Sequence, residues 1–217
     1  IIQNGKDDKD LGEVVLLAKN EIGYKNLLIL TNVFSINEDY EKFVHGIELE
    51  KYKDGLLLLT GGVENGFLAK PASLNRITLV KERLKYLKNI FNDNLYIELQ
   101  RHGIKSQLIA EKILTELACE HDLPLVATND CFFPNENKFE AHQVLTCIDK
   151  GLTISSDKRR TLTKEHYLKD PKKMISLFND IPEAIENTAI IAKRCSFFVK
   201  TRNPILPKYP GLGNITE

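Results

Sequence analysis

Short apolar runs alternate with amphipathic stretches along the first 130 residues. Four of these runs are predicted strands, at residues 13–18, 55–60, 95–99 and 123–129. Three stretches with helical spacing of apolar residues are predicted helices, at residues 24–33, 74–91 and 109–119. Ser73 and Ser106 are predicted to cap the second and third of these helices. Strands separated by helices predict an α/β fold with a parallel sheet, either a barrel or a doubly wound sheet.

Beyond about residue 135 the pattern is mainly helical. Helices are predicted around residues 139–148, 174–178 and 181–195, with Pro182 in the first turn of the last one. The apolar triplet 197–199 is a candidate further strand. The proline-rich end of the chain favours a linker that leaves the domain. We therefore expect one domain over residues 1–200 and a linker over residues 201–217.

The composition narrows the class of protein. The apolar fraction of 42% and charged fraction of 28% are those of an ordinary soluble globular protein. No apolar run is long enough to span a bilayer, and the first residues lack the order of a signal peptide. Four scattered cysteines without a C-x-x-C pair favour reduced thiols over a zinc ribbon or a disulfide framework. We expect a cytoplasmic protein without membrane contact, and a first residue other than Met suggests a segment of a longer chain.

The zero net charge hides an asymmetry between the two parts of the chain. Residues 1–149 have an acidic excess, and residues 150–217 have a basic excess of the same size. Lys158, Arg159 and Arg160 form a basic cluster that could contact nucleic-acid phosphates. No aromatic residues are interleaved with this cluster, so a solvated surface is the favoured interpretation.

Polar residues follow two of the predicted strands. His102 lies just beyond the third strand, and Asn129 and Asp130 lie just beyond the fourth. In a parallel barrel these strand ends meet on one face. Imidazole and carboxylate together suit zinc or manganese, so His102 and Asp130 are candidate metal ligands. From these residues alone the simpler interpretation stays ahead: a hydrogen-bonded histidine, and an aspartate that caps a turn.

Six strings spread along the chain resemble a known family. They are LLAKNEIGYKNL, GLLLLTGG, LYIELQRHG, LPLVATND, KFEAHQVLTCIDKG and LFNDIPEAIENTAIIAKRC. In this order they resemble the PHP (polymerase and histidinol phosphatase) domain of bacterial DNA polymerase III alpha subunits, over about residues 11–207. The resemblance implies a distorted (β/α) barrel, incomplete at its N-terminal side, followed by a helical C-terminal part. It also implies a cleft of the metal-binding type at the C-terminal ends of the strands.

The chain departs from the family pattern at several ligand positions. The resemblance implies His at the position of Glu13, Cys at Gly62 and His at Phe132, and it implies an H-x-H motif upstream of residue 1. His102 and Asp130 match the pattern. The metal positions are therefore expected to be vestigial at His102, Asp130 and Glu13 and lost at Gly62 and Phe132. Too few donors then remain for a catalytic metal cluster.

These departures lead to structural expectations. Phe132 should pack against apolar side chains, so that Phe132→Ala costs about 3–5 kcal/mol. His142, in the shared EAH string, should be a structural histidine with a local hydrogen bond. The strand near residues 14–17 should lie at a sheet edge and favour self-association, because the family's first strands are missing.

The resemblance implies a structural and scaffolding part of a DNA-directed DNA polymerase, a nucleotidyltransferase of chromosomal replication. No catalytic residue and no cofactor are expected in this segment, and Mg²⁺ is expected only at the palm of the full-length protein. The implied partners are the proofreading exonuclease subunit, other polymerase III holoenzyme subunits, and DNA through the full-length protein. The main alternative is a metal-dependent phosphoesterase or 3'-5' proofreading exonuclease using His102, Asp130 and Glu13. An unrelated α/β domain that binds a small molecule is a third alternative.

Overall fold

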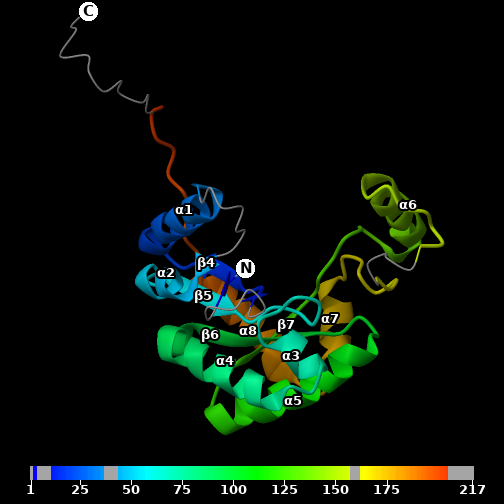
Figure 1. Cartoon of the computed structure of the whole chain (residues 1–217), viewed down its shortest axis with the longest axis horizontal. Coiled ribbons are helices and arrows are strands. Elements are labelled where there is room, and N and C mark those ends of the chain that lie inside the picture. Colours follow the sequence, from blue (N-terminus) through cyan, green and yellow to red (C-terminus); the bar gives the residue numbers. More distant parts are fainter. Residues whose placement is uncertain (1, 4–10, 37–43, 157–161, 205–217) are drawn as a thin grey trace, which may run out of the picture.

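The computed structural model describes residues 2–3, 11–36, 44–156 and 162–204 of the chain (Figure 1). The strands are β1 (Ile2–Gln3), β2 (Leu11–Gly12), β3 (Val15–Ala18), β4 (Val44–His45), β5 (Leu56–Leu59), β6 (Leu95–Gln100) and β7 (Leu125–Thr128). The helices are α1 (Glu21–Ile36), α2 (Gly46–Lys51), α3 (Ala69–Ser73), α4 (Ile77–Phe91), α5 (Lys105–His121), α6 (Phe139–Asp149), α7 (Pro171–Leu177) and α8 (Pro182–Arg194). Two 3₁₀ turns, η1 (Asn92–Asn94) and η2 (Glu136–Lys138), precede β6 and α6.

The main sheet has four strands in the order β3-β5-β6-β7. Strands β5, β6 and β7 are parallel, whereas β3 is antiparallel to β5, with Val15 opposite Leu59. The prediction of a parallel sheet is therefore wrong for β3, because hydrophobic periodicity reports which faces are buried and not the direction of a strand. Strand β3 lies at the sheet edge, as expected. No described pairing joins β3 to β7, so closure into a barrel stays a prediction; a smaller sheet has the order β2-β1-β4.

Helices cover both faces of the main sheet. All four leucines of β5 are buried: Leu56 and Leu58 belong to the main core, and Leu57 and Leu59 to a second, smaller one. Helices α3, α4 and α5 contribute to the main core, and Ile191 of α8 contributes to the second. A strand that is buried on both faces needs no polar alternation, which explains the continuous LLLL string.

The predicted serine caps are wrong. Ser73 ends α3, where its hydroxyl donates to the backbone oxygen of Lys70 at 2.7 Å, and α4 begins only at Ile77. Ser106 lies inside α5, whose N-cap is Ile104 in an extended conformation. A serine before an amphipathic run is a common cap but not a required one, and here other backbone geometry determines where the helices begin.

The C-terminal helices follow the predicted pattern more closely. Pro182 is the first residue of α8, as expected, because the missing N–H of proline costs nothing there. The triplet 197–199 forms no strand, and residues 196–204 are without helix or strand. Most of the predicted linker, residues 205–217, lies outside the described residues, so the domain boundary stays a prediction. No helix in the described ranges has both the length and the apolar character needed to cross a bilayer.

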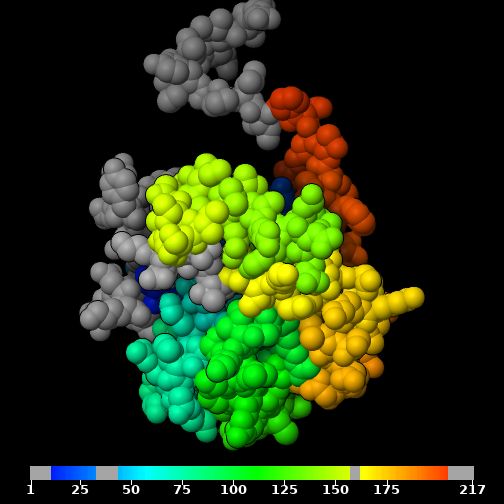
Figure 2. Space-filling view, turned by 90° about the vertical axis from the view of Figure 1, so that its right-hand side faces the viewer, coloured from blue at the N-terminus to red at the C-terminus, as the bar shows by residue number. Residues whose placement is uncertain are grey.

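Helix α6 is set apart from the rest of the fold (Figure 1). The chain leaves the end of β7, forms α6, and comes back through residues 163–169, which we call the return segment. This segment pairs with the chain that leaves β7: Phe133 and Tyr167 form a parallel bridge, and Phe132 N–H donates to the oxygen of His166 at 2.9 Å. In the space-filling view the yellow return segment lies between the yellow-green α6 region and the green body (Figure 2).

Candidate functional site

A cleft of about 780 Å³ opens at the C-terminal ends of β5, β6 and β7. One wall is the glycine-rich turn that follows β5, and the other comes from the residues that follow β6 and β7. The lining includes Glu13, Gly62 and Asp130, three positions at which the family resemblance implies metal ligands. His102 is buried and Phe132 lies farther along the chain, and neither belongs to the lining.

The cleft is acidic. Its lining includes four carboxylates, Glu13, Glu64, Glu98 and Asp130. Among the described lining residues there is no lysine and no arginine. A phosphate group entering this cleft would therefore meet negative charge without a cation from the lining to balance it.

Glu98 has its hydrogen-bonding capacity met within the protein. One carboxylate oxygen accepts from the backbone N–H of Gly61 at 2.9 Å. The other accepts from the hydroxyl of Thr128 at 2.5 Å and from the amide of Gln100 at 3.0 Å. The residue Glu98 is 5% exposed, and its buried carboxylate forms an internal crosslink between β5, β6 and β7.

The space beside Gly62 is occupied. A Cβ atom at Gly62 would collide with the side-chain carboxamide of Gln100. That carboxamide is fixed by its hydrogen bonds to Glu98 and Thr128. Gln100 thus fills the position where the family resemblance implies a cysteine ligand, and no room is left for a thiolate.

Hydrogen bonds fix the orientation of the His102 ring. The whole residue is buried, with 1% of its surface exposed. The backbone N–H of His102 donates to Oε1 of Gln107 at 2.6 Å, so the amide nitrogen of Gln107 must face the imidazole. That nitrogen lies 2.8 Å from Nδ1 and donates to it. In the neutral ring Nε2 therefore carries the proton, and it donates to Oδ1 of Asn129 at 3.1 Å.

The electrostatic environment keeps this ring neutral. The pKa of His102 is lowered to about 3, mainly by burial and also by nearby His166 and Lys169, while the hydrogen bond to Asn129 opposes this shift. A neutral imidazole with protonated Nε2 and hydrogen-bonded Nδ1 has no free lone pair for a metal. His102 is therefore held as a neutral, hydrogen-bonded group inside the fold.

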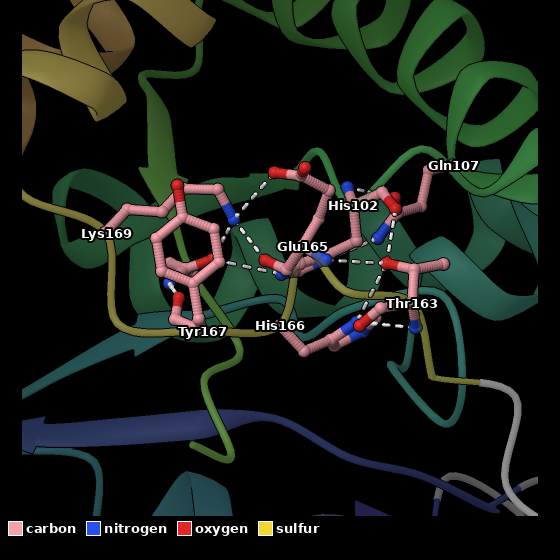
Figure 3. A network of polar contacts seen from close by, with 8 residues as sticks. His102, Gln107, Thr163, Glu165, His166, Tyr167 and Lys169 are labelled. Carbon is pink, nitrogen blue, oxygen red and sulfur yellow. Dashed lines mark hydrogen bonds and ion pairs between the residues drawn. The ribbon is translucent and has the colours of Figure 1, made fainter. Parts of the chain in front are cut away.

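The return segment covers His102 (Figure 3). The ring of His166 stacks on the ring of His102 with centroids 4.0 Å apart and an interplanar angle of 11°. The hydroxyl of Thr163 donates to the backbone oxygen of His102 at 2.7 Å. The backbone N–H of Thr163 lies 3.1 Å from Nδ1 of His166 and donates to it. The stacked His166 ring thus covers one face of the His102 imidazole.

Lys169 ends the return segment with a side chain that is fully buried. Its ammonium donates to Oδ1 of Asn129 at 3.2 Å and to the backbone oxygen of Glu165, and it lies 3.5 Å from the Glu165 carboxylate. It also lies 4.7 Å from the centroid of the Tyr167 ring. Burial lowers the pKa of Lys169, and the charge and hydrogen bond of Glu165 oppose that effect.

Two expectations about aromatic neighbours need correction. Phe132 is half-buried, and its described ring neighbours are imidazoles, with centroids 5.8 Å from His142 and 6.0 Å from His166. The buried ring is instead that of the next residue, Phe133, which is 6% exposed and packs on the ring of Phe139. His142 packs on both phenylalanine rings, and its buried Nδ1 has no hydrogen-bond partner among the described atoms, so the expected local hydrogen bond is wrong for that atom.

The residues present do not fit a metal ion. Within the described ranges no three His, Cys, Asp or Glu side chains come together in a way that could hold one. Glu13 is exposed and accepts from the amide of Asn65 at 3.3 Å, on the other side of the cleft from the buried His102. The basic cluster at Lys158, Arg159 and Arg160 lies outside the described residues, so its role stays a prediction.

The sequence patterns missed three residues of this site: Gln107, His166 and Lys169. Gln107 lies in the first turn of an amphipathic helix, where polar residues are common and give no signal. The other two lie in an irregular stretch between helices. Only their position against His102 in the fold reveals what they do.

Comparisons with known proteins identify relatives of this chain. Residues 2–102 match the family model described as PHP domain. The DNA polymerase III subunit alpha of Caulobacter vibrioides is 40% identical over 199 residues, which is 91% of this chain and 17% of that protein. The subunit of the same name from Borreliella burgdorferi is 39% identical over 211 residues, 94% of this chain and 18% of that protein. That of Rickettsia conorii is 34% identical over 223 residues and covers the whole chain.

This chain thus spans less than a fifth of the length of these relatives, at 17 or 18%. Its similarity extends over nearly all of its own length, and the PHP match covers the segment that builds β1 to β6 and ends at the buried histidine. Residues 2–102 therefore belong to the PHP domain family, and nearly the whole chain is homologous to a part of the DNA polymerase III alpha subunit.

Proposed function

We propose that the chain is the PHP-domain part of a DNA polymerase III alpha subunit and serves that replicative DNA polymerase as a structural and scaffolding domain. Its cleft is a degenerate metal cleft without hydrolytic activity. Polymerisation, with its Mg²⁺ ions, belongs to the palm of the full-length protein, and this segment contributes no catalytic residue. The full-length protein would act in the cytoplasm with the proofreading exonuclease subunit, other holoenzyme subunits and DNA.

The hydrogen-bonded state of His102 carries the argument against hydrolysis. Metal-dependent phosphoesterases need several lone pairs directed at one point, and they need a cation to neutralise the phosphate. Here Nδ1 accepts from Gln107, Nε2 donates to Asn129, and the described cleft lining offers only carboxylates as charged groups. Without a metal this acidic cleft repels a phosphodiester.

The similarity to polymerase subunits supports the rest of the proposal. The relatives share 34–40% identity with nearly all of this chain, which supports assigning it to a part of such a subunit. A domain of this kind offers surfaces on which other parts of the polymerase assemble. The buried network at the cleft gives those surfaces a rigid base.

The test is a metal and activity assay on the purified chain. The protein is loaded with Zn²⁺ or Mn²⁺, desalted, and analysed for bound metal and for hydrolysis of p-nitrophenyl phosphate and single-stranded DNA. We expect substoichiometric metal and no turnover above that of the Asp130→Asn variant. Stoichiometric metal together with nuclease activity that is lost on chelation would establish the phosphoesterase or proofreading alternative.

A binding assay tests the scaffolding role. The full-length alpha subunit of the same source, with its PHP part present or deleted, is titrated with the exonuclease subunit and assayed for DNA synthesis on a primed template. The proposal predicts that the deletion weakens the complex or destabilises the polymerase. Equal binding and equal thermal stability of both forms would contradict it.

A further inference from the structure

The return segment is held to the rest of the fold by backbone hydrogen bonds to the chain that leaves β7 and by side-chain contacts at its two ends. Thr163 donates to His102 at one end, and Lys169 contacts Asn129 at the other. Between them His166 stacks on His102 (Figure 3). Because α6 lies in the chain between β7 and the return segment, contacts that hold the return segment also hold α6 to the fold.

The surroundings of Lys169 match the needs of an ammonium ion. An ammonium has three N–H donors and no acceptor. Three oxygens surround the Lys169 nitrogen: Oδ1 of Asn129, the backbone oxygen of Glu165 and a carboxylate oxygen of Glu165. The face of the Tyr167 ring adds a fourth favourable contact for positive charge. These hydrogen-bond, ion-pair and ring contacts all favour positive charge on the Lys169 nitrogen, and they oppose the effects of burial and of the Lys173 charge.

Asn129 connects this ammonium to His102. Its Oδ1 accepts both from Lys169 and from Nε2 of His102, and its amide donates to the backbone oxygen of Tyr167 at 2.7 Å. The amide orientation is fixed, because Lys169 can only donate and the Tyr167 oxygen can only accept. Asn129, which follows β7, thus connects His102, which follows β6, to both Tyr167 and Lys169.

We propose that Lys169 is a built-in cation of this site, and that its ammonium fastens the return segment, and with it α6, to the ends of β6 and β7. It acts as a positioning residue: it orients Asn129, which in turn keeps the proton of His102 on Nε2. The polar residues at the strand ends that could have held a metal ion are instead crosslinked by a charge from the chain itself. This inference deepens the proposed scaffolding function and rests on it, since it explains how a cleft without a metal ion supports a projecting helix.

The experiment compares Lys169→Met with Lys164→Met. Both changes remove a lysine from the return segment, but Lys164 is exposed and makes no described polar contact. Native-state hydrogen exchange is followed at the backbone amides of Phe132 and Leu168. Both amides donate hydrogen bonds between the return segment and the chain that leaves β7. In Lys169→Met we expect these amides to lose protection by at least about tenfold, while core amides of β6 keep theirs. Lys164→Met should behave as the unmodified protein does.

Equal protection of Phe132 and Leu168 in Lys169→Met and Lys164→Met would overturn the inference. If Lys169→Met does not fold, two NMR measurements on the unmodified protein decide. We expect the Lys169 ammonium protons to give a slowly exchanging signal at pH 7 and His102 to be the Nε2–H tautomer. A neutral Lys169 amine, or His102 protonated on Nδ1, would overturn the inference.

Addition of ZnCl₂ separates this inference from the proposed function. The His102 signals should not move on zinc addition. A shift of these signals would overturn both the metal-free scaffold and the built-in cation. If Lys169→Met leaves the protection of Phe132 and Leu168 unchanged and the His102 signals do not respond to zinc, only the inference drawn here is overturned. The scaffolding function then stands.

Discussion

Arg101 is the strongest described electrostatic link between the parallel sheet and the C-terminal helices, and its removal gives a quantitative test of the fold. Its guanidinium makes two hydrogen bonds to Glu111 of α5, at 3.0 and 2.5 Å. It makes two more to Asp180, at 2.6 and 2.8 Å, and one to the backbone oxygen of Leu177 at 2.6 Å. The same group lies 4.5 Å from the centroid of the Phe178 ring, which is fully buried.

The expected cost of Arg101→Met follows from exposure. The side chains of Arg101 and Glu111 are 17% and 16% exposed, so losing this pair leaves a nearly buried carboxylate without its partner. A hydrogen bond to a charged group contributes about 1.5–3 kcal/mol. The side chain of Asp180 is 56% exposed, so its pair contributes about 1 kcal/mol or less. We expect Arg101→Met to lower the free energy of unfolding by about 2–4 kcal/mol and Asp180→Asn by about 0.5–1 kcal/mol.

Urea unfolding of both variants measures these differences, and Arg76→Met, which changes an exposed arginine, is the matched control. The double variant with Asp180→Asn should be little worse than Arg101→Met alone, because the two changes break the same link. A cost below about 1 kcal/mol for Arg101→Met would refute the reasoning, since it would mean that solvent replaces all five hydrogen bonds without loss.

Three further outcomes are expected for the cleft and the residues around it. The folded protein holds His102 neutral with a pKa of about 3 against 6.5 when unfolded. The unfolded chain therefore binds more protons between these values, and stability should fall with decreasing pH by up to about 1.4 kcal/mol per unit, a slope that urea titrations should find reduced in His102→Gln. Gly62→Ala should cost about 1–2 kcal/mol in thermal unfolding, and less in a Gln100→Ala background, since the new methyl group collides with the Gln100 side chain. Phe132→Ala should cost about 1–2 kcal/mol, below the range for a fully buried ring, because Phe132 is half-buried; a measured loss above 3 kcal/mol in urea unfolding would contradict this.

The strand and helix content could be predicted because both periods are strong in this sequence. The continuous apolar string of β5 follows from burial on both faces of the sheet. The spacing of apolar residues in α4 and α5 follows from burial of one face of each helix. The direction of β3 could not be predicted, since an antiparallel and a parallel edge strand bury the same side chains. The triplet 197–199 has the apolar character of a strand, but Phe198 is 84% exposed and no described strand lies beside it.

The site was predictable only at the strand ends. His102 and Asp130 stand directly after apolar runs, so their place at one end of the sheet followed from the sequence. Whether His102 holds a metal or a hydrogen bond depends on Gln107 and Lys169, which are brought to it by a helix turn and by a segment more than sixty positions away. Tertiary contacts of that kind leave no trace in local periodicity.

Helix α8 has a consequence for synthesis of the protein on the ribosome. Its residue Ile191 packs with Leu57, Leu59 and Val126, yet the helix follows β7 by about 55 residues. During translation these sheet residues would stay uncovered for several seconds, since chains grow at about 5–20 residues per second. The nascent sheet therefore presents an apolar face to chaperones before α8 emerges, and a pause in translation within residues 130–180 would lengthen that exposure. Codon usage in this interval should thus affect the yield of folded protein more than codon usage after residue 195.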